Sequence, residues 1–241
     1  MKPIFYKELQ SFFSHPVGYL ILGTFLTLNA LLLWFFKGYS NVILTGFAHL
    51  NAFFSNSSWV FLFLIPAMTM KSFADEYQQG TIELLKTLPL KSSEIILGKF
   101  FAYACILFIT LLLSCVFVYS VYQLGNPVGN IDLGSTFTSY FGLLLLACFY
   151  IAIGMFCSIL TQNNITSFIL ASLINAIFYF GFTALENLSE GITSGWHLLG
   201  VPFHFDSMSR GVIALSDIMY FISLSFLFLG FTHLKLQDDR L

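Results

Sequence analysis

Charge-free apolar stretches alternate with short polar segments along most of this chain. A helix needs about 20 predominantly apolar residues to cross roughly 30 Å of hydrocarbon. The second such stretch has no sharp beginning, because several of its first residues are polar, and Asp217 lies near the start of the last stretch. The pattern predicts an all-α integral membrane protein, a single transmembrane domain over residues 1–241, with six transmembrane helices at about 17–36, 50–70, 100–123, 136–160, 165–185 and 211–234.

The polar segment at 71–98, between the second and third predicted spans, is itself organised. Gly80 can let the backbone turn after the second span. The Thr81 hydroxyl is suited to cap a following helix by accepting a hydrogen bond from an amide in its first turn. Pro89 disfavours helix at the preceding residue. We therefore predict a short helix from about Thr81 to Leu88, followed by a helix capped by Ser92 or Ser93 with Glu94 in its first turn.

This short helix is too brief to be stable alone and needs a surface on which to pack. Leu84, Leu85 and Leu88 supply its apolar side. Two alternatives follow from the residues: the helix rests on lipid headgroups, or it docks into a groove on a soluble subunit and transmits that subunit's motion to the spans.

The N-terminal residues predict a helix lying at the membrane interface. Apolar residues recur there at helical spacing while polar ones point elsewhere: Phe5, Leu9, Phe12 and Phe13 against Lys7, Glu8 and Gln10. The apolar run that follows is longer than a signal-peptide core and lacks a small-x-small cleavage site. The segment is either a simple anchor or a coupled, moving elbow helix.

Composition supports the membrane assignment, because 57% of the residues are hydrophobic and only 9% are charged, against about 25% in soluble domains. The formal net charge of −2 argues against a nucleic-acid partner. Basic residues are retained on the cytoplasmic side. Six spans with both termini cytoplasmic place all of them there except Lys37 and Arg210, namely Lys2, Lys7, Lys71, Lys86, Lys91, Lys99, Lys235 and Arg240.

Motifs for catalysis or cofactor binding are not found in the sequence. No phosphate-binding Gly-x-x-x-x-Gly-Lys-Ser/Thr loop occurs, since Gly98-Lys99 is followed by Phe100 and lacks the upstream glycine. The cysteines are dispersed inside predicted spans, without metal-ligand spacing: Cys105, Cys115, Cys148 and Cys157. We predict that this chain is not an enzyme and binds no cofactor, metal or ATP of its own.

An aromatic-rich segment, 186–210, lies between the fifth and sixth predicted spans. It predicts a short re-entrant or interfacial piece, which either seals the outer end of the bundle or serves as an exit gate. Asp217 follows Arg210 by about two helical turns, so these two are expected to pair along one face. A proton relay through Asp217 is the functional alternative for this ionisable residue.

The polar segment resembles the coupling-helix signature of ABC-2 type permeases, Glu-x-x-x-Gly-Thr-x-Glu-x-Leu-x-x-x-Pro. The residues that carry this resemblance are Glu76, Gly80, Thr81, Glu83, Leu84, Leu85 and Pro89. Family members often have a basic residue near positions 78 and 79, where this chain has Gln78 and Gln79. Residues 12–20, 63–73, 202–206 and 209–211 resemble one branch, the gliding-motility-associated (GldF-like) permeases.

The resemblance implies a six-helix permease of the bacterial inner membrane that works as part of an ATP-driven exporter. It implies a second permease, either the same chain or a paralogue, and two separate nucleotide-binding ATPase subunits that bind the ATP. Alternating access would follow when closure of those subunits pushes the short helix and tilts the second and third spans. An ATP-independent secondary carrier or channel is the alternative, although the fourth and fifth spans have few polar pathway residues.

Overall fold

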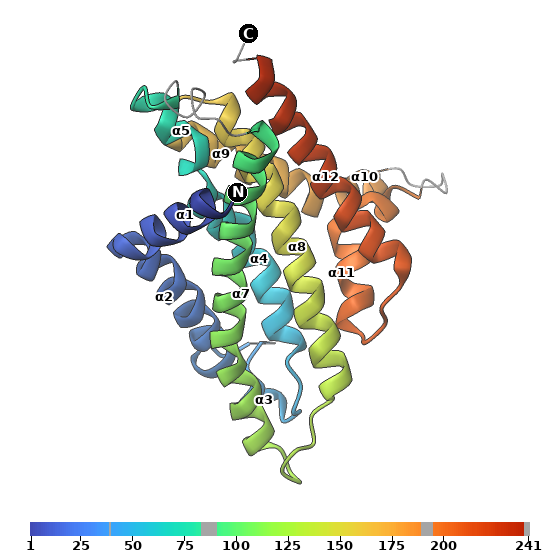
Figure 1. The fold of residues 1–241 in the computed structure, drawn as a ribbon. Helices are drawn as coiled ribbons and strands as arrows, with labels where there is room; N and C mark the ends of the chain where they lie inside the picture. The colour runs from blue at the N-terminus through green and yellow to red at the C-terminus, as the bar shows by residue number, and fades with distance from the viewer. Residues whose placement is uncertain (39, 83–90, 189–194, 239–241) are drawn as a thin grey trace.

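The computed structural model describes residues 1–38, 40–82, 91–188 and 195–238, and most of them are helical (Figure 1). Six helices within these ranges are long and apolar enough to cross a membrane, which confirms the predicted all-α class and the six spans. They are Pro16–Phe35, Asn51–Gln78, Ser92–Leu124, Leu133–Leu160, Asn164–Asn187 and Leu215–Asp238. We call the end of the bundle drawn uppermost in Figure 1 the upper end, and the opposite end the lower end.

The predicted N-terminal helix is α1 (Lys2–Ser14), which lies across the bundle near the upper end (Figure 1). The chain turns sharply at His15 into the first span, formed by α2 (Pro16–Ala30) and the π-helical η1 (Leu31–Phe35). A Cβ at Gly18 would lie 2.3 Å from the Phe12 carbonyl oxygen. Glycine is therefore required for the close approach of α1 and α2.

The second span extends beyond its predicted end at residue 70. After the short α3 (Val42–Thr45), α4 (Asn51–Thr69) is followed, with a break at Met70, by α5 (Lys71–Gln78). Hydropathy stops at Lys71, but the helical backbone continues for about two more turns. The polar segment thus begins as a rigid extension of the second span.

The third span begins eight residues before the predicted Phe100, because α7 runs from Ser92 to Leu124. Its N-cap is Lys91 and not the predicted Ser92 or Ser93. The Glu94 carboxylate accepts a hydrogen bond from the Lys91 amide at 3.2 Å, which fixes the helix start one residue earlier.

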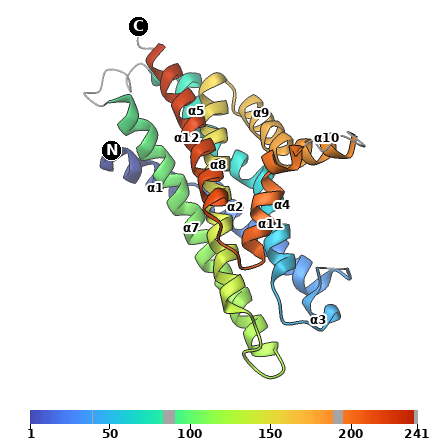
Figure 2. The same cartoon turned by 90° about the vertical axis from the view of Figure 1, so that its right-hand side faces the viewer.

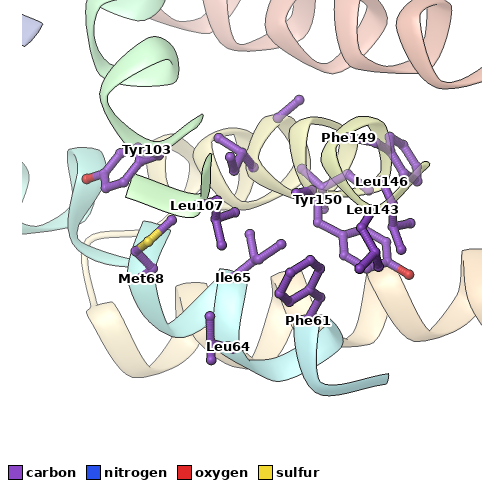
Figure 3. Packing of buried hydrophobic residues seen from close by; sticks show 14 of the residues in the cluster. Phe61, Leu64, Ile65, Met68, Tyr103, Leu107, Leu143, Leu146, Phe149 and Tyr150 are labelled. Atoms are coloured by element: carbon purple, nitrogen blue, oxygen red, sulfur yellow. The ribbon is translucent and has the colours of Figure 1, made fainter. Parts of the chain in front are cut away.

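The fourth span, α8 (Leu133–Leu160), is the centre of the molecule. It packs against α4, α7, α11 and α12 as well as the start of the fifth span. Figure 3 shows apolar side chains of α4, α7 and α8 meeting in this core, among them Phe61, Ile65, Leu107 and Leu143. These four side chains are fully or almost fully buried, so α8 is enclosed by protein over much of its length.

The fifth span runs obliquely away from α8 (Figure 2) and is interrupted by a π-helical segment. It comprises α9 (Asn164–Ala176), η2 (Ile177–Gly181) and α10 (Phe182–Leu188). After residues 189–194, which lie outside the described ranges, η3 (Trp196–Leu199) and α11 (Val201–Ser209) follow. The sixth span is α12 (Leu215–Asp238).

The predicted short piece between the last two spans corresponds to η3 and α11. Figures 1 and 2 place α11 beside the lower half of α8. Hydroxyl groups of α8 hold it there, since Thr138 donates to the Met208 carbonyl at 2.9 Å and Ser135 donates to the Ser209 carbonyl at 2.9 Å.

Candidate functional site

Three elements of the upper end converge on one buried cation, Lys99. It lies on the third turn of α7, and its side chain extends between α1 and α5. Lys99 is only 1% exposed. An isolated ammonium group is very costly to bury, so its surroundings must compensate for the charge.

The Lys99 Nζ has three acceptors, as many as an ammonium group has N–H bonds. It donates to Glu8 Oε1 of α1 at 2.8 Å, to Glu76 Oε1 of α5 at 3.1 Å and to the Ser72 carbonyl oxygen at 2.5 Å. The Phe73 ring centroid lies 4.9 Å from Nζ and adds a cation–π contact. We call Lys99, Glu8 and Glu76 the lysine cluster.

Two further side chains, those of Lys7 and Tyr103, contact the carboxylates of the lysine cluster. Lys7 Nζ lies 3.5 Å from Glu76 Oε1, and the Tyr103 hydroxyl donates to Glu8 Oε2 at 3.4 Å. The side chain of Lys7 is 62% exposed, so its pair with Glu76 is screened and weak, whereas the pairs with Lys99 are buried. The two carboxylates and two lysines balance in charge, and Lys99 supplies the main link between the three helices.

A polar cavity of about 360 Å³ adjoins the lysine cluster. Its lining extends from Lys71 and Gln79, which are exposed, to the buried Lys99. Both carboxylates of the lysine cluster also line it. Movements of α1 or α5 would therefore change the solvation of the ion pairs as well as their distances.

The opposite side of α5 is fastened to α8 by one hydroxyl group. Ser158 Oγ donates to the Met70 carbonyl at 2.9 Å and accepts from the amides of Phe73 at 2.9 Å and Ala74 at 3.0 Å. These contacts occupy the backbone groups left free at the break between α4 and α5. α5 is thus held between the lysine cluster and α8.

The start of α9 also contacts α5, because Asn164 Nδ2 donates to the Asp75 carboxylate. The turn between α8 and α9 therefore lies against α5. Displacement of α5 would act on the second, third, fourth and fifth spans together.

Of the predicted coupling residues, the described ranges contain Glu76, Gly80 and Thr81. Glu76 belongs to the lysine cluster, and Gly80 has a φ of +68°, which lets the chain turn after α5. The Thr81 hydroxyl donates back to the Glu76 carbonyl at 3.4 Å. The other predicted residues, Glu83, Leu84, Leu85 and Pro89, and most of the predicted helix ending at Leu88, lie outside the described ranges.

Sequence reasoning missed Lys99, Glu8 and Ser158. Lys99 is buried within α7, and Glu8 points toward it, contrary to the prediction that Glu8 faces away from the packed side of α1. Because α7 begins at Ser92, Lys99 lies two turns inside it. A charged residue at such a position in a span is a signal for a buried, paired charge.

At the lower end, Asp217 does not pair with Arg210 as predicted. Its Oδ1 lies 2.7 Å from His204 Nδ1, while the Arg210 Nε donates to the Asp206 carbonyl at 3.2 Å. The fold of α11 back onto α12 brings His204 to Asp217, and this could not be read from helical spacing on α12 alone. Over the described ranges, no group of three or more His, Cys, Asp or Glu side chains is arranged to hold a metal ion.

Comparison with known proteins relates this architecture to one transporter family. Residues 17–194 match the family model described as ABC-2 family transporter protein. The match extends from the first candidate span through the fifth. No curated protein matches the sequence.

Proposed function

Because this chain belongs to the ABC-2 transporter family, and is thus a membrane permease subunit of an ABC transporter, we propose that it serves an ATP-driven exporter and receives its energy through α5. The ATP is bound and hydrolysed by separate nucleotide-binding subunits. This chain contributes the membrane path and contains no phosphate-binding loop in its sequence.

The observation that carries the proposal is the convergence of α1, α5 and α7 on Lys99. The residues Glu76, Gly80 and Thr81 match the coupling signature, and the first of them bonds directly to Lys99 at 3.1 Å. A push on the segment after Gly80 would reach the third span through this ion pair and the fourth through Ser158. A rigid connection of this kind is needed to convert a partner's closure into helix tilting.

In the proposed cycle, closure of the ATPase subunits displaces the segment after Gly80 and, with it, α5. The bundle then alternates between access from the two sides of the membrane. The predicted residues Glu83, Leu84, Leu85 and Pro89 form the contact with the ATPase, as the family signature implies. The two Gln residues at positions 78 and 79 leave this contact without a basic side chain there.

The assembly contains a second permease, either another copy or a paralogue, and lies in the bacterial inner membrane with both termini cytoplasmic. The concentration of Lys and Arg on segments assigned to the cytoplasm supports this orientation. The similarity of residues 12–20, 63–73, 202–206 and 209–211 to gliding-motility-associated permeases supports a role in such a system.

Affinity purification of the full chain from native membranes, with identification of the bound chains, tests the proposal. An ATPase subunit and a second permease chain are expected in the complex. Purification of the chain alone, together with transport in liposomes without ATP, would overturn it in favour of a secondary carrier.

The purified complex allows a sharper test at Glu83. Glu83→Lys is expected to uncouple ATP hydrolysis from transport while leaving the chain in the membrane. Gln123→Lys, which adds a positive charge to an exposed position at the lower end, is the matched control. Equal activity of the Glu83→Lys complex and the control would contradict entry of energy through this segment.

A further inference from the structure

The pair formed by His204 and Asp217 is unusual because both ring nitrogens of the histidine face acceptors. His204 Nδ1 lies 2.7 Å from Asp217 Oδ1, and Nε2 lies 2.9 Å from the Leu198 carbonyl oxygen. His204 is 7% exposed and Asp217 is 3% exposed. The pair links η3, α11 and α12 at the lower end.

A neutral imidazole has one N–H group and one lone pair. With Asp217 ionised and a single proton on the ring, either the Nδ1 lone pair would face a carboxylate oxygen at 2.7 Å or the Nε2 lone pair would face a carbonyl oxygen at 2.9 Å. Either arrangement is repulsive at hydrogen-bond distance. An imidazolium, which donates from both nitrogens, satisfies both contacts at once.

Charge balance and ring stacking favour the same state. An imidazolium beside the Asp217 carboxylate makes the buried pair neutral overall, whereas a neutral histidine would leave one uncompensated negative charge near the start of a transmembrane helix. The Tyr220 ring stacks on the His204 ring with centroids 4.0 Å apart and planes 23° apart. A cation over the face of a tyrosine ring is stabilised by the ring quadrupole.

We propose that His204 and Asp217 form a proton-binding site that locks η3 and α11 to α12 at the lower end. The bound proton is held by His204, and its loss breaks one of the two contacts. Tyr220 adds a second link between the same elements by donating to the Leu199 carbonyl at 2.6 Å. This inference goes beyond the proposed function, because it requires neither the ATPase subunit nor a particular cargo.

Other titratable and charged groups lie on the elements packed around the proton-binding site, and several have partners of their own. Glu186 of α10 pairs with His197 of η3 at 2.7 Å, and the Tyr179 hydroxyl of η2 bonds with that of Ser58 at 3.1 Å. Others near this end are Tyr150 of α8, Asp206 and Arg210 at the end of α11, and Tyr220 of α12. Within the part of the chain that the structure describes, Asp217 is the carboxylate that contacts the His204 ring.

The protonation state is tested directly by nitrogen-15 NMR of histidine in the full chain reconstituted in lipid nanodiscs. His204→Gln identifies the His204 signals by difference. Both ring nitrogens are expected to be protonated, because both face acceptors. A neutral His204 with one protonated nitrogen would overturn the proposal.

The role of the carboxylate is tested with Asp217→Asn, in which an amide replaces the negative charge at nearly the same shape. A neighbouring opposite charge favours protonated histidine, so one ring nitrogen of His204 should lose its proton in this variant. Asp206→Asn, which removes an exposed carboxylate of α11, is the matched control and should leave both ring nitrogens protonated. Identical His204 nitrogen signals in the two variants would overturn the proposal.

The lock itself is tested with spin labels at two exposed residues, Trp196 of η3 and Leu215 of α12. Their distance distribution in nanodiscs should be narrow when His204 and Asp217 are both present and broader in Asp217→Asn and in His204→Gln. Equally narrow distributions in all three chains would contradict the lock.

Discussion

The Lys99 ammonium lies inside a transmembrane helix, where a charge is retained only with full compensation. Its three hydrogen bonds provide that compensation, and two of them come from carboxylates on other helices. Removal of one partner from a buried ion pair costs more than the pair contributes, because the remaining charge stays buried and unpaired. The lysine cluster therefore makes the positions of α1 and α5 depend on α7.

Lys99→Met should lower the free energy of unfolding by about 3–5 kcal/mol, because Glu8 and Glu76 would face each other without their shared cation. Lys99→Arg keeps the charge and should cost less. Denaturant unfolding in mixed micelles measures both, with Lys37→Met at an exposed position as the control. A Lys99→Met variant as stable as the Lys37→Met control would show that the lysine cluster does not hold these helices together.

Gly154 of α8 lies where α8 packs closely against Thr69 at the end of α4. A Cβ there would lie 2.0 Å from Thr69 Oγ1 and 2.9 Å from Thr69 Cβ. Gly154→Ala should therefore cost about 1–3 kcal/mol through overpacking. Gly23→Ala in α2, where a Cβ meets nothing within 4 Å, is the matched control and should not destabilise the chain. Thermal unfolding of the two variants distinguishes them, and equal midpoints would contradict the close packing.

At the scale of elements, α5 connects the membrane spans to the polar segment, because it extends the second span into that segment. Its polar sequence gives no apolar stripe long enough to fix it, so its position depends on contacts at both sides. The lysine cluster lies on one side and Ser158 of α8 on the other. We expect α5 to move together with the fourth span as well as the third.

Ser158→Ala should loosen α5 locally, because the amides of Phe73 and Ala74 would lose their acceptor. Hydrogen–deuterium exchange of these amides should become faster, since local opening would cost less free energy. Ser120→Ala, at an exposed position of α7, removes a hydroxyl that bonds to the Val116 carbonyl of its own helix and serves as the control. Exchange in α5 that is equal in both variants would contradict the role of Ser158.

At the scale of the whole molecule, six spans place the N-terminal helix and the last turns of α12 at the same, upper end of the bundle (Figure 1). The upper end contains α5, the lysine cluster and the turn between α8 and α9. The lower end contains α11, its hydrogen bonds to α8 and the proton-binding site. The proposed entry point of energy and the proposed proton-binding site thus lie at opposite ends of one core, which α8 connects.

The topology is tested with single cysteines at Val128, in the turn at the lower end, and Gln162, in the turn at the upper end; both positions are exposed. In intact cells, a membrane-impermeant maleimide should label Val128→Cys, whereas Gln162→Cys should react only after lysis. The unmodified chain, with its four native cysteines, provides the background. Labelling of Gln162→Cys in intact cells would reverse the orientation.

Much of the fold follows from hydropathy alone, because a bilayer requires long apolar helices and their number can be counted along the chain. The helix α1 was also predictable from the spacing of Phe5, Leu9 and Phe12. The ends of the spans were less predictable. The second span continues past Met70 and the third begins before Phe100, since hydrogen bonds and caps, rather than hydropathy, decide where a helix stops.

The sequence by itself determined the class of the protein, the six spans and, through Glu76, Gly80 and Thr81, where to look for the proposed coupling segment. Only the tertiary structure decided which charges meet. Lys99 joins Glu8 and Glu76, which are 91 and 23 residues away, and His204 rather than Arg210 joins Asp217. Hydropathy reports the solvent that each segment prefers, whereas pairing across helices depends on their packing, which no local pattern records.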